Sequence, residues 1–154
     1  MMITPTANFT RPANTTAYTA ADLVADNTTA GSVTPMKFSL QRLGNTGKII
    51  SARLAKSNTT ATLATFNIHL FTESPVVTNG DNGAFAISTS RYYLGKIAVD
   101  LSSGAQAGTA YLAKQSSAVA IGVDAATIYG LIEAGAGYTP ASGEVFEVML
   151  AIES

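Results

Sequence analysis

The sequence contains one histidine, His69, and no cysteine. A histidine can serve as the general base of a Ser-His-Asp site, but that chemistry needs an exposed serine and a buried acid beside it, and no motif around His69 supplies them. His69 also lies at an odd position of the segment 64–70, whose even positions are apolar. We therefore expect a surface or interface histidine, and no enzyme activity.

Two glycine-containing segments could bind ions or phosphate. Residues 79–83 read Asn-Gly-Asp-Asn-Gly, but a calcium loop needs several oxygen ligands and a late bidentate Glu, which does not follow here. Residues 135–137 read Gly-Ala-Gly, but Pro140 follows where a phosphate-binding helix would begin. Both segments are better interpreted as turns. We expect neither a metal nor a cofactor.

Aromatic side chains could bind a sugar or single-stranded bases, yet six Tyr and no Trp make a poor platform for either. Tyr92 and Tyr93 are adjacent, so in a strand one of them faces the outer surface. Beside them, residues 72–90 contain Pro75 and the 79–83 turn, which predicts a long irregular loop. An exposed tyrosine near this loop fits a glycan-binding face and a protein contact equally well.

Period-two alternation of apolar and polar residues predicts the elements that carry these groups. It is clearest in residues 50–56 and 64–70, which are separated by the polar turn 57–60 and predict a β-hairpin with Phe66 in the core. The pattern recurs in 36–40, 92–101, 118–123, 127–133 and 145–152. Residues 16–25 fit a strand or one helical turn, and we expect them to be extended. About eight strands with long connections predict an all-β fold, an antiparallel β-sandwich of jelly-roll type.

The first sixteen residues differ from the rest. Residues 1–16 are rich in Thr, Asn and Pro, with Pro5 and Pro12 favouring extended backbone. We expect an extended N-terminal arm over 1–16, ordered by a neighbouring subunit, and a single sandwich domain over 17–154.

The composition limits the partners. Charged residues make up 12% of the 154 residues and the net charge is −1, against a usual charged fraction of about 25%. This charge provides no field to attract nucleic acid, and no run of eighteen apolar residues predicts a membrane segment. Removing water from a neutral surface of small residues costs little free energy, which suits broad protein contacts and a homo-oligomer.

Several segments together resemble a known family. They are 10–18 (Thr-Arg-Pro-Ala-Asn-Thr-Thr-Ala-Tyr), 21–24 (Ala-Asp-Leu-Val), 81–85 (Asp-Asn-Gly-Ala-Phe), 129–134 (Tyr-Gly-Leu-Ile-Glu-Ala) and 138–140 (Tyr-Thr-Pro). The sequence resembles the head decoration, or cement, proteins of tailed bacteriophages. The resemblance implies a jelly-roll protein, made in the host cytoplasm, that binds the outer surface of the head as an oligomer and stabilises contacts between major capsid subunits.

On this interpretation the candidate partner contacts are Arg11, Pro12, Tyr18, Tyr92 and Tyr93. Two alternatives remain open at this point. One is another virion component, such as a tail or fibre protein. The other is a β-sandwich glycan-binding module that uses the 72–90 loop and a tyrosine.

Overall fold

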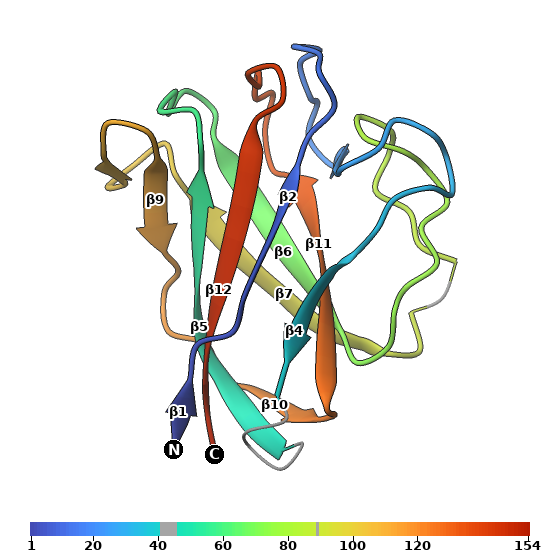
Figure 1. Ribbon diagram of the computed structural model, residues 1–154, viewed down its shortest axis with the longest axis vertical. Helices are drawn as coiled ribbons and strands as arrows, with labels where there is room; N and C mark the ends of the chain where they lie inside the picture. Colours follow the sequence, from blue (N-terminus) through green and yellow to red (C-terminus); the bar gives the residue numbers. More distant parts are fainter. Residues whose placement is uncertain (41–45, 89) are drawn as a thin grey trace.

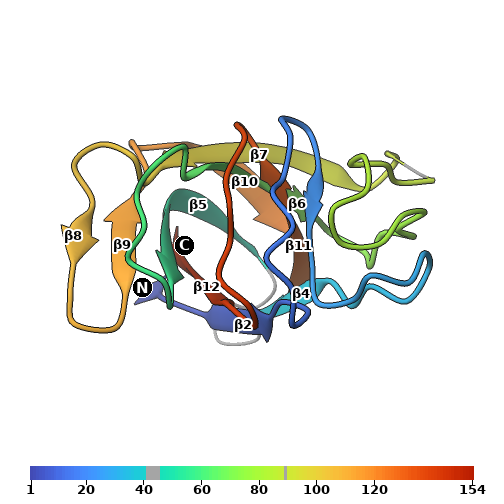
Figure 2. The ribbon, with the colours of Figure 1, turned by 90° about the horizontal axis from the view of Figure 1, so that it is seen from above.

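The computed structural model describes residues 1–40, 46–88 and 90–154, and all regular secondary structure in these residues is β (Figure 1). The strands are β1 (Met2–Ile3), β2 (Thr6–Thr10), β3 (Leu23–Val24), β4 (Met36–Ser39), β5 (Thr46–Lys56), β6 (Thr65–Phe71), β7 (Tyr93–Asp100), β8 (Gln106–Ala107), β9 (Leu112–Gln115), β10 (Ile121–Asp124), β11 (Thr127–Ala134) and β12 (Val145–Glu153). They form two antiparallel sheets, seen as two layers in Figure 2.

The first sheet has the order β2-β12-β5-β9, with β1, β8 and β10 as short additions, and the second has the order β4-β11-β6-β7, with β3 beside β11. Along the chain, these eight main strands alternate between the sheets at every step except β6 to β7. This connectivity is that of a jelly roll, a sandwich of two four-stranded sheets. The predicted antiparallel sandwich is therefore confirmed, and the strands beyond the expected eight are the short ones.

The predicted hairpin of residues 50–56 and 64–70 is wrong, although both strands exist. β5 pairs with β12 and β9 in the first sheet, whereas β6 pairs with β11 and β7 in the second. The polar segment between them crosses from one sheet to the other. Two strands that each have one apolar face can lie side by side or face each other across a core, and alternation alone does not distinguish these arrangements.

The core between the sheets contains the apolar residues that alternation predicted. Phe66 is fully buried, and its ring meets the rings of Tyr138 and Phe146 edge-on at 5.3 Å. Other predicted core residues are also buried: Met36, Phe38, Leu40, Ala52, Leu54, Ile68, Leu70, Ile97, Val99, Leu101, Val148, Leu150 and Ile152. Ile49 is buried in place of the predicted Ile50, next to a register irregularity between β5 and β12.

The predicted N-terminal arm is also wrong, because residues 1–16 include two strands of the sandwich, β1 and β2. β1 and β2 both pair with β12, so this segment forms one edge of the first sheet. Phe9 stacks on Phe146 with ring centroids 5.6 Å apart. The apolar positions Ala7 and Phe9 do alternate with Thr6, Asn8 and Thr10, but this short pattern lies in a stretch whose overall composition resembles a disordered segment.

The predicted long loop between β6 and β7 is present and covers part of the second sheet. Its Val77, Phe85 and Ile87 pack with Phe71 and Leu131 on the face that points away from the main core. The 79–83 segment is a turn, as predicted, and Asn82 has a φ of 67°. Gly80 lies so close to Thr28 that a Cβ there would be 2.1 Å from the Thr28 carbonyl oxygen. A loop of this length is thus fixed to the fold by its own side chains.

Candidate functional site

A buried cluster of Arg11, Tyr18 and Asp81 joins three parts of the chain. Arg11 Nη2 lies 3.0 Å from Asp81 Oδ2, and both side chains are fully buried. Arg11 Nε donates to the Tyr18 hydroxyl, which in turn donates to Asp81 Oδ1 at 2.7 Å. The backbone N–H of Ala25 donates to the same oxygen at 2.9 Å. The tyrosine therefore bridges the cation and the carboxylate.

Lys56, Tyr138 and Glu144 repeat this arrangement. Lys56 Nζ lies 3.3 Å from Glu144 Oε1, and these two side chains are also fully buried. Lys56 Nζ donates to the Tyr138 hydroxyl at 2.9 Å, and that hydroxyl donates to Glu144 Oε1 at 2.7 Å. Lys56 Nζ further donates to the carbonyl oxygens of Asn58 and of Thr60, the latter at 2.6 Å. The lysine is thus surrounded by acceptors, as a buried ammonium requires.

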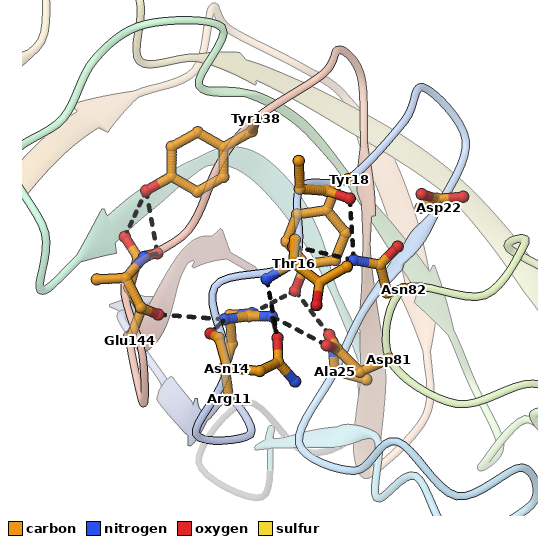
Figure 3. A network of polar contacts seen from close by, with 12 residues as sticks. Arg11, Asn14, Thr16, Tyr18, Asp22, Ala25, Asp81, Asn82, Tyr138 and Glu144 are labelled. Atoms are coloured by element: carbon orange, nitrogen blue, oxygen red, sulfur yellow. Dashed lines mark hydrogen bonds and ion pairs between the residues drawn. The ribbon is translucent and has the colours of Figure 1, made fainter.

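Hydrogen bonds between the two clusters make them one unit (Figure 3). The N–H of Arg11 donates to the Glu144 carbonyl at 2.9 Å, and the N–H of Tyr18 donates to the Tyr138 carbonyl at 2.9 Å. Asn82 Nδ2 donates to the carbonyls of Thr16 and Ala17 at 3.0 and 3.1 Å. The connections that follow β2, β5, β6 and β11 are consequently held together at one end of the sandwich.

The environment of these groups suits a structural role. Burial raises the pKa of Tyr18 and of Tyr138, so both hydroxyls remain donors. Burial lowers the pKa of Lys56, an effect that the Glu144 carboxylate opposes. Among the described residues, no buried side-chain nitrogen or oxygen lacks a hydrogen-bond partner. With every group paired and enclosed, the clusters do not offer a substrate an open acid or base.

The surface that these clusters hold in place is uncharged. We call it the loop end, and it consists of residues 12–20, 57–63 and 135–143, which contain no Asp, Glu, Lys or Arg. Figure 1 shows these three connections together at the top of the molecule. The residues exposed on the loop end are small apart from Leu63, which is 52% exposed: Ala13, Thr15, Thr16, Ala17, Thr19, Ala20, Thr59, Thr60, Thr62, Gly135, Gly137, Thr139 and Ser142.

His69 belongs to a separate polar group on the second sheet. It lies on the strand face opposite the main core, as predicted, but it is only 8% exposed because the ring of Phe85 stacks on it at 4.3 Å. The expectation of a surface histidine is therefore wrong. His69 Nε2 lies 3.3 Å from Glu133 Oε1, and Nδ1 lies 3.0 Å from the Tyr93 hydroxyl. Both ring nitrogens are thus engaged within the chain.

This environment predicts a contribution of His69 to the pH dependence of stability. Burial lowers its pKa, with Lys96 adding to the effect and Glu133 opposing it. The unfolded chain therefore binds a proton at a higher pH than the folded chain, so protonation favours unfolding as the pH falls below about 6.5. We expect the stability advantage of the wild type over His69→Gln to shrink between pH 7 and pH 5.

Urea denaturation of both proteins at the two pH values measures this difference. The substitution leaves every carboxylate of the wild type in place. Because His69 is the sole histidine, the variant has no imidazole left to titrate, and it serves as the matched reference. An advantage that stays constant or grows on acidification would contradict the assignment.

The five candidate partner contacts fall into two groups. Arg11 and Tyr18 are buried in the first cluster, so they do not present the contact surface that was expected of them. Pro12 is half-buried at the loop end. Tyr92 is half-buried with the Arg91 guanidinium 5.5 Å from its ring, and Tyr93 is 40% exposed while its ring contacts His69 and Phe71.

Sequence reasoning missed Lys56, Tyr138 and Glu144. A signal was present, because Lys56 and Glu144 both fall in the apolar phase of their strand patterns, two residues from Leu54 and from Phe146. A charge at a core-facing position indicates a buried ion pair when a second charge of opposite sign occupies such a position.

No cluster of three or more His, Asp or Glu side chains in residues 1–40, 46–88 and 90–154 could hold a metal ion. The same residues form no helix that is long and apolar enough to cross a membrane.

None of the protein-family models matches this sequence, and no curated protein matches it. Among solved structures, the K1 cleaved adhesin domain of Lys-gingipain from Porphyromonas gingivalis is 15% identical over 79% of this chain and 66% of that chain, with a TM-score of 0.31. The empty capsid of Triatoma virus is 16% identical over 97% of this chain and 70% of that chain, with a TM-score of 0.29. A second Triatoma virus structure is 16% identical over 97% of this chain and 61% of that chain, with a TM-score of 0.28. Overlap at this level identifies neither a family nor a shared function.

Proposed function

We propose that the chain is a non-enzymatic structural protein of a virus particle, which binds the outer surface of a tailed-phage head as an oligomer and reinforces contacts between major capsid subunits. The observation that carries the proposal is the loop end, an uncharged surface of small residues held by two buried ion-pair clusters. The jelly-roll topology and the sequence resemblance described above support the same assignment.

The lack of charge on the loop end favours a protein partner. Small neutral side chains lose little hydration free energy when they are covered, and they lose little rotamer entropy. Thr, Ser and exposed backbone groups can still hydrogen bond across the contact, while Leu63 supplies an apolar side chain to insert into a partner. Such a surface fits a closely packed protein contact, and it lacks the positive charge that would attract nucleic acid.

The buried clusters explain how irregular loops could bind tightly. Removing two ion pairs from water is costly, and apolar replacements are often as stable or more stable. What the clusters provide is one defined conformation for three loops that have few apolar side chains of their own. Loops ordered before binding lose less entropy when they bind, which raises affinity without any further contact.

Binding to phage heads that lack the protein tests this proposal. We expect the wild type to co-sediment with such heads at a saturating number of copies. Thr139→Arg, which adds a bulky cation at an exposed position of the loop end, should weaken this binding by about tenfold or more, because the charge would be buried without a partner.

Ala98→Arg is the matched control, since Ala98 is exposed on β7 of the second sheet. It adds the same side chain away from the loop end, so it should bind as the wild type does. A wild-type protein that does not sediment with heads, or that binds isolated tails instead, would overturn the head assignment. Equal binding by Thr139→Arg would show that the loop end is not the contact.

A further inference from the structure

The outer face of the first sheet is largely uncovered in the described part of the chain. Figure 1 looks onto this face, and the short connection between β1 and β2 crosses it near its lower end, over β12 and β5. The strand register places the following side chains on the central part of this face, which we call the open face: Thr6, Asn8, Ser51, Arg53, Ala55, Ala113, Gln115, Glu147, Met149 and Ala151. Ser51 and Ala55 among them are buried. The second sheet differs, because the loop between β6 and β7 covers part of its outer face.

The open face has the shape and composition of an interface. Apart from Arg53 and Glu147 its residues are neutral and mostly small, so another protein surface can approach the strands closely. Three shallow hollows of 260, 350 and 390 Å³ adjoin on it, and Arg53 lines all three. Tyr111, which is 46% exposed, lines one hollow, and Met2, which is 61% exposed, lines another. A tyrosine and a methionine are side chains that commonly fill such hollows across an interface.

The charges on the open face are self-complementary. Arg53 Nη2 lies 3.8 Å from Glu147 Oε1, and the two side chains are 46% and 35% exposed. Farther along the same two strands, Lys48 Nζ lies 3.5 Å from Glu153 Oε1. These two pairs are each neutral as a unit, and Lys114, which lines one of the hollows, adds a further cation beside them. An exposed pair of this kind contributes at most about 1 kcal/mol to the stability of a single chain.

We propose that the open face binds a second copy of this chain about a two-fold axis. An axis that lies in the plane of the face and passes between Arg53 and Glu147 brings Arg53 of each copy over Glu147 of the other. One ion pair per chain then becomes a four-charge cluster at the centre of the contact, with the hollows and their Tyr111 and Met2 side chains around it. Self-complementarity of one patch is the requirement of a two-fold interface.

This inference specifies the oligomer of the proposed function, but its test does not require heads. The reversals Arg53→Glu and Glu147→Arg each place like charges opposite one another twice per dimer. We expect each variant alone to dimerise about 100-fold more weakly than the wild type, because like charges at an interface cost several kcal/mol. In an equimolar mixture of the two variants every facing pair is again opposite in sign, so the mixture should dimerise as the wild type does.

Sedimentation equilibrium measures the masses, with the wild type expected at twice 15.8 kDa. Lys37→Glu is the matched control, an exposed charge reversal on β4 of the second sheet, and it should remain dimeric. A monomeric wild type, single variants that dimerise normally, or a mixture that stays monomeric would each overturn the pairing. Head binding by the monomeric variants, measured separately, shows whether the loop end works without the dimer.

Discussion

Deletion of residues 2–16 is expected to unfold the sandwich or to lower its melting temperature by tens of degrees. The deletion removes the two strands that pair with one side of β12 and exposes Phe146, on which Phe9 stacks. It also removes Arg11 and leaves the buried carboxylate of Asp81 without its cation, which alone costs about 3–5 kcal/mol. The free energy of unfolding of a domain is about 5–15 kcal/mol, so these losses together approach the total stability of the protein.

Thermal unfolding followed by circular dichroism checks this result. Arg11→Met in the full-length chain isolates the contribution of the ion pair, and with about 2–4 °C per kcal/mol it should lower the melting temperature by roughly 6–20 °C. Deleting Met1 and Met2 is the control, since both side chains are largely exposed, and it should have a small effect. A cooperatively folded protein that lacks residues 2–16 would restore the hypothesis of a detachable arm.

The sequence allowed the strands and their inner faces to be predicted because burial on one side leaves a period-two pattern. Phe38, Phe66 and Val148 are buried where that pattern places them. The pattern describes one strand at a time, however. It does not say whether β5 lies beside β6 or across the core from it, since both arrangements bury the same residues, and pairing partners depend on the path of the whole chain.

The N-terminal segment shows a second limit of sequence reasoning. Its pairing with β12 uses backbone hydrogen bonds, whose carbonyl acceptors every residue carries, so a strand can form here without a long apolar pattern to mark it. Tyr18 was assigned to a contact surface on the strength of the family resemblance. Its burial depends on Asp81, which lies 63 positions away in the chain, and a pairing over that separation leaves no local pattern.

Lys56→Met is expected to destabilise the protein by about 3–5 kcal/mol, because Glu144 would remain buried without its cation. The triple variant Lys56→Met, Tyr138→Phe, Glu144→Leu removes all three polar partners together. Since apolar replacement of an entire buried pair is often neutral or stabilising, the triple variant should recover most of the lost stability. Urea denaturation of the single and triple variants measures both effects.

The two variants separate stability from conformational order at the loop end. In the triple variant the carbonyls of Asn58 and Thr60 lose the lysine that holds them, and the N–H of Ala141 loses the Glu144 carboxylate that accepts its hydrogen bond. We therefore expect faster amide exchange in residues 57–63 and 135–143 and weaker binding to heads, although the core remains folded. If the triple variant exchanges and binds as the wild type does, the buried charges do not order the loop end. If it is as unstable as Lys56→Met, the cluster acts through stability alone, and the argument that it exists to shape a binding surface fails.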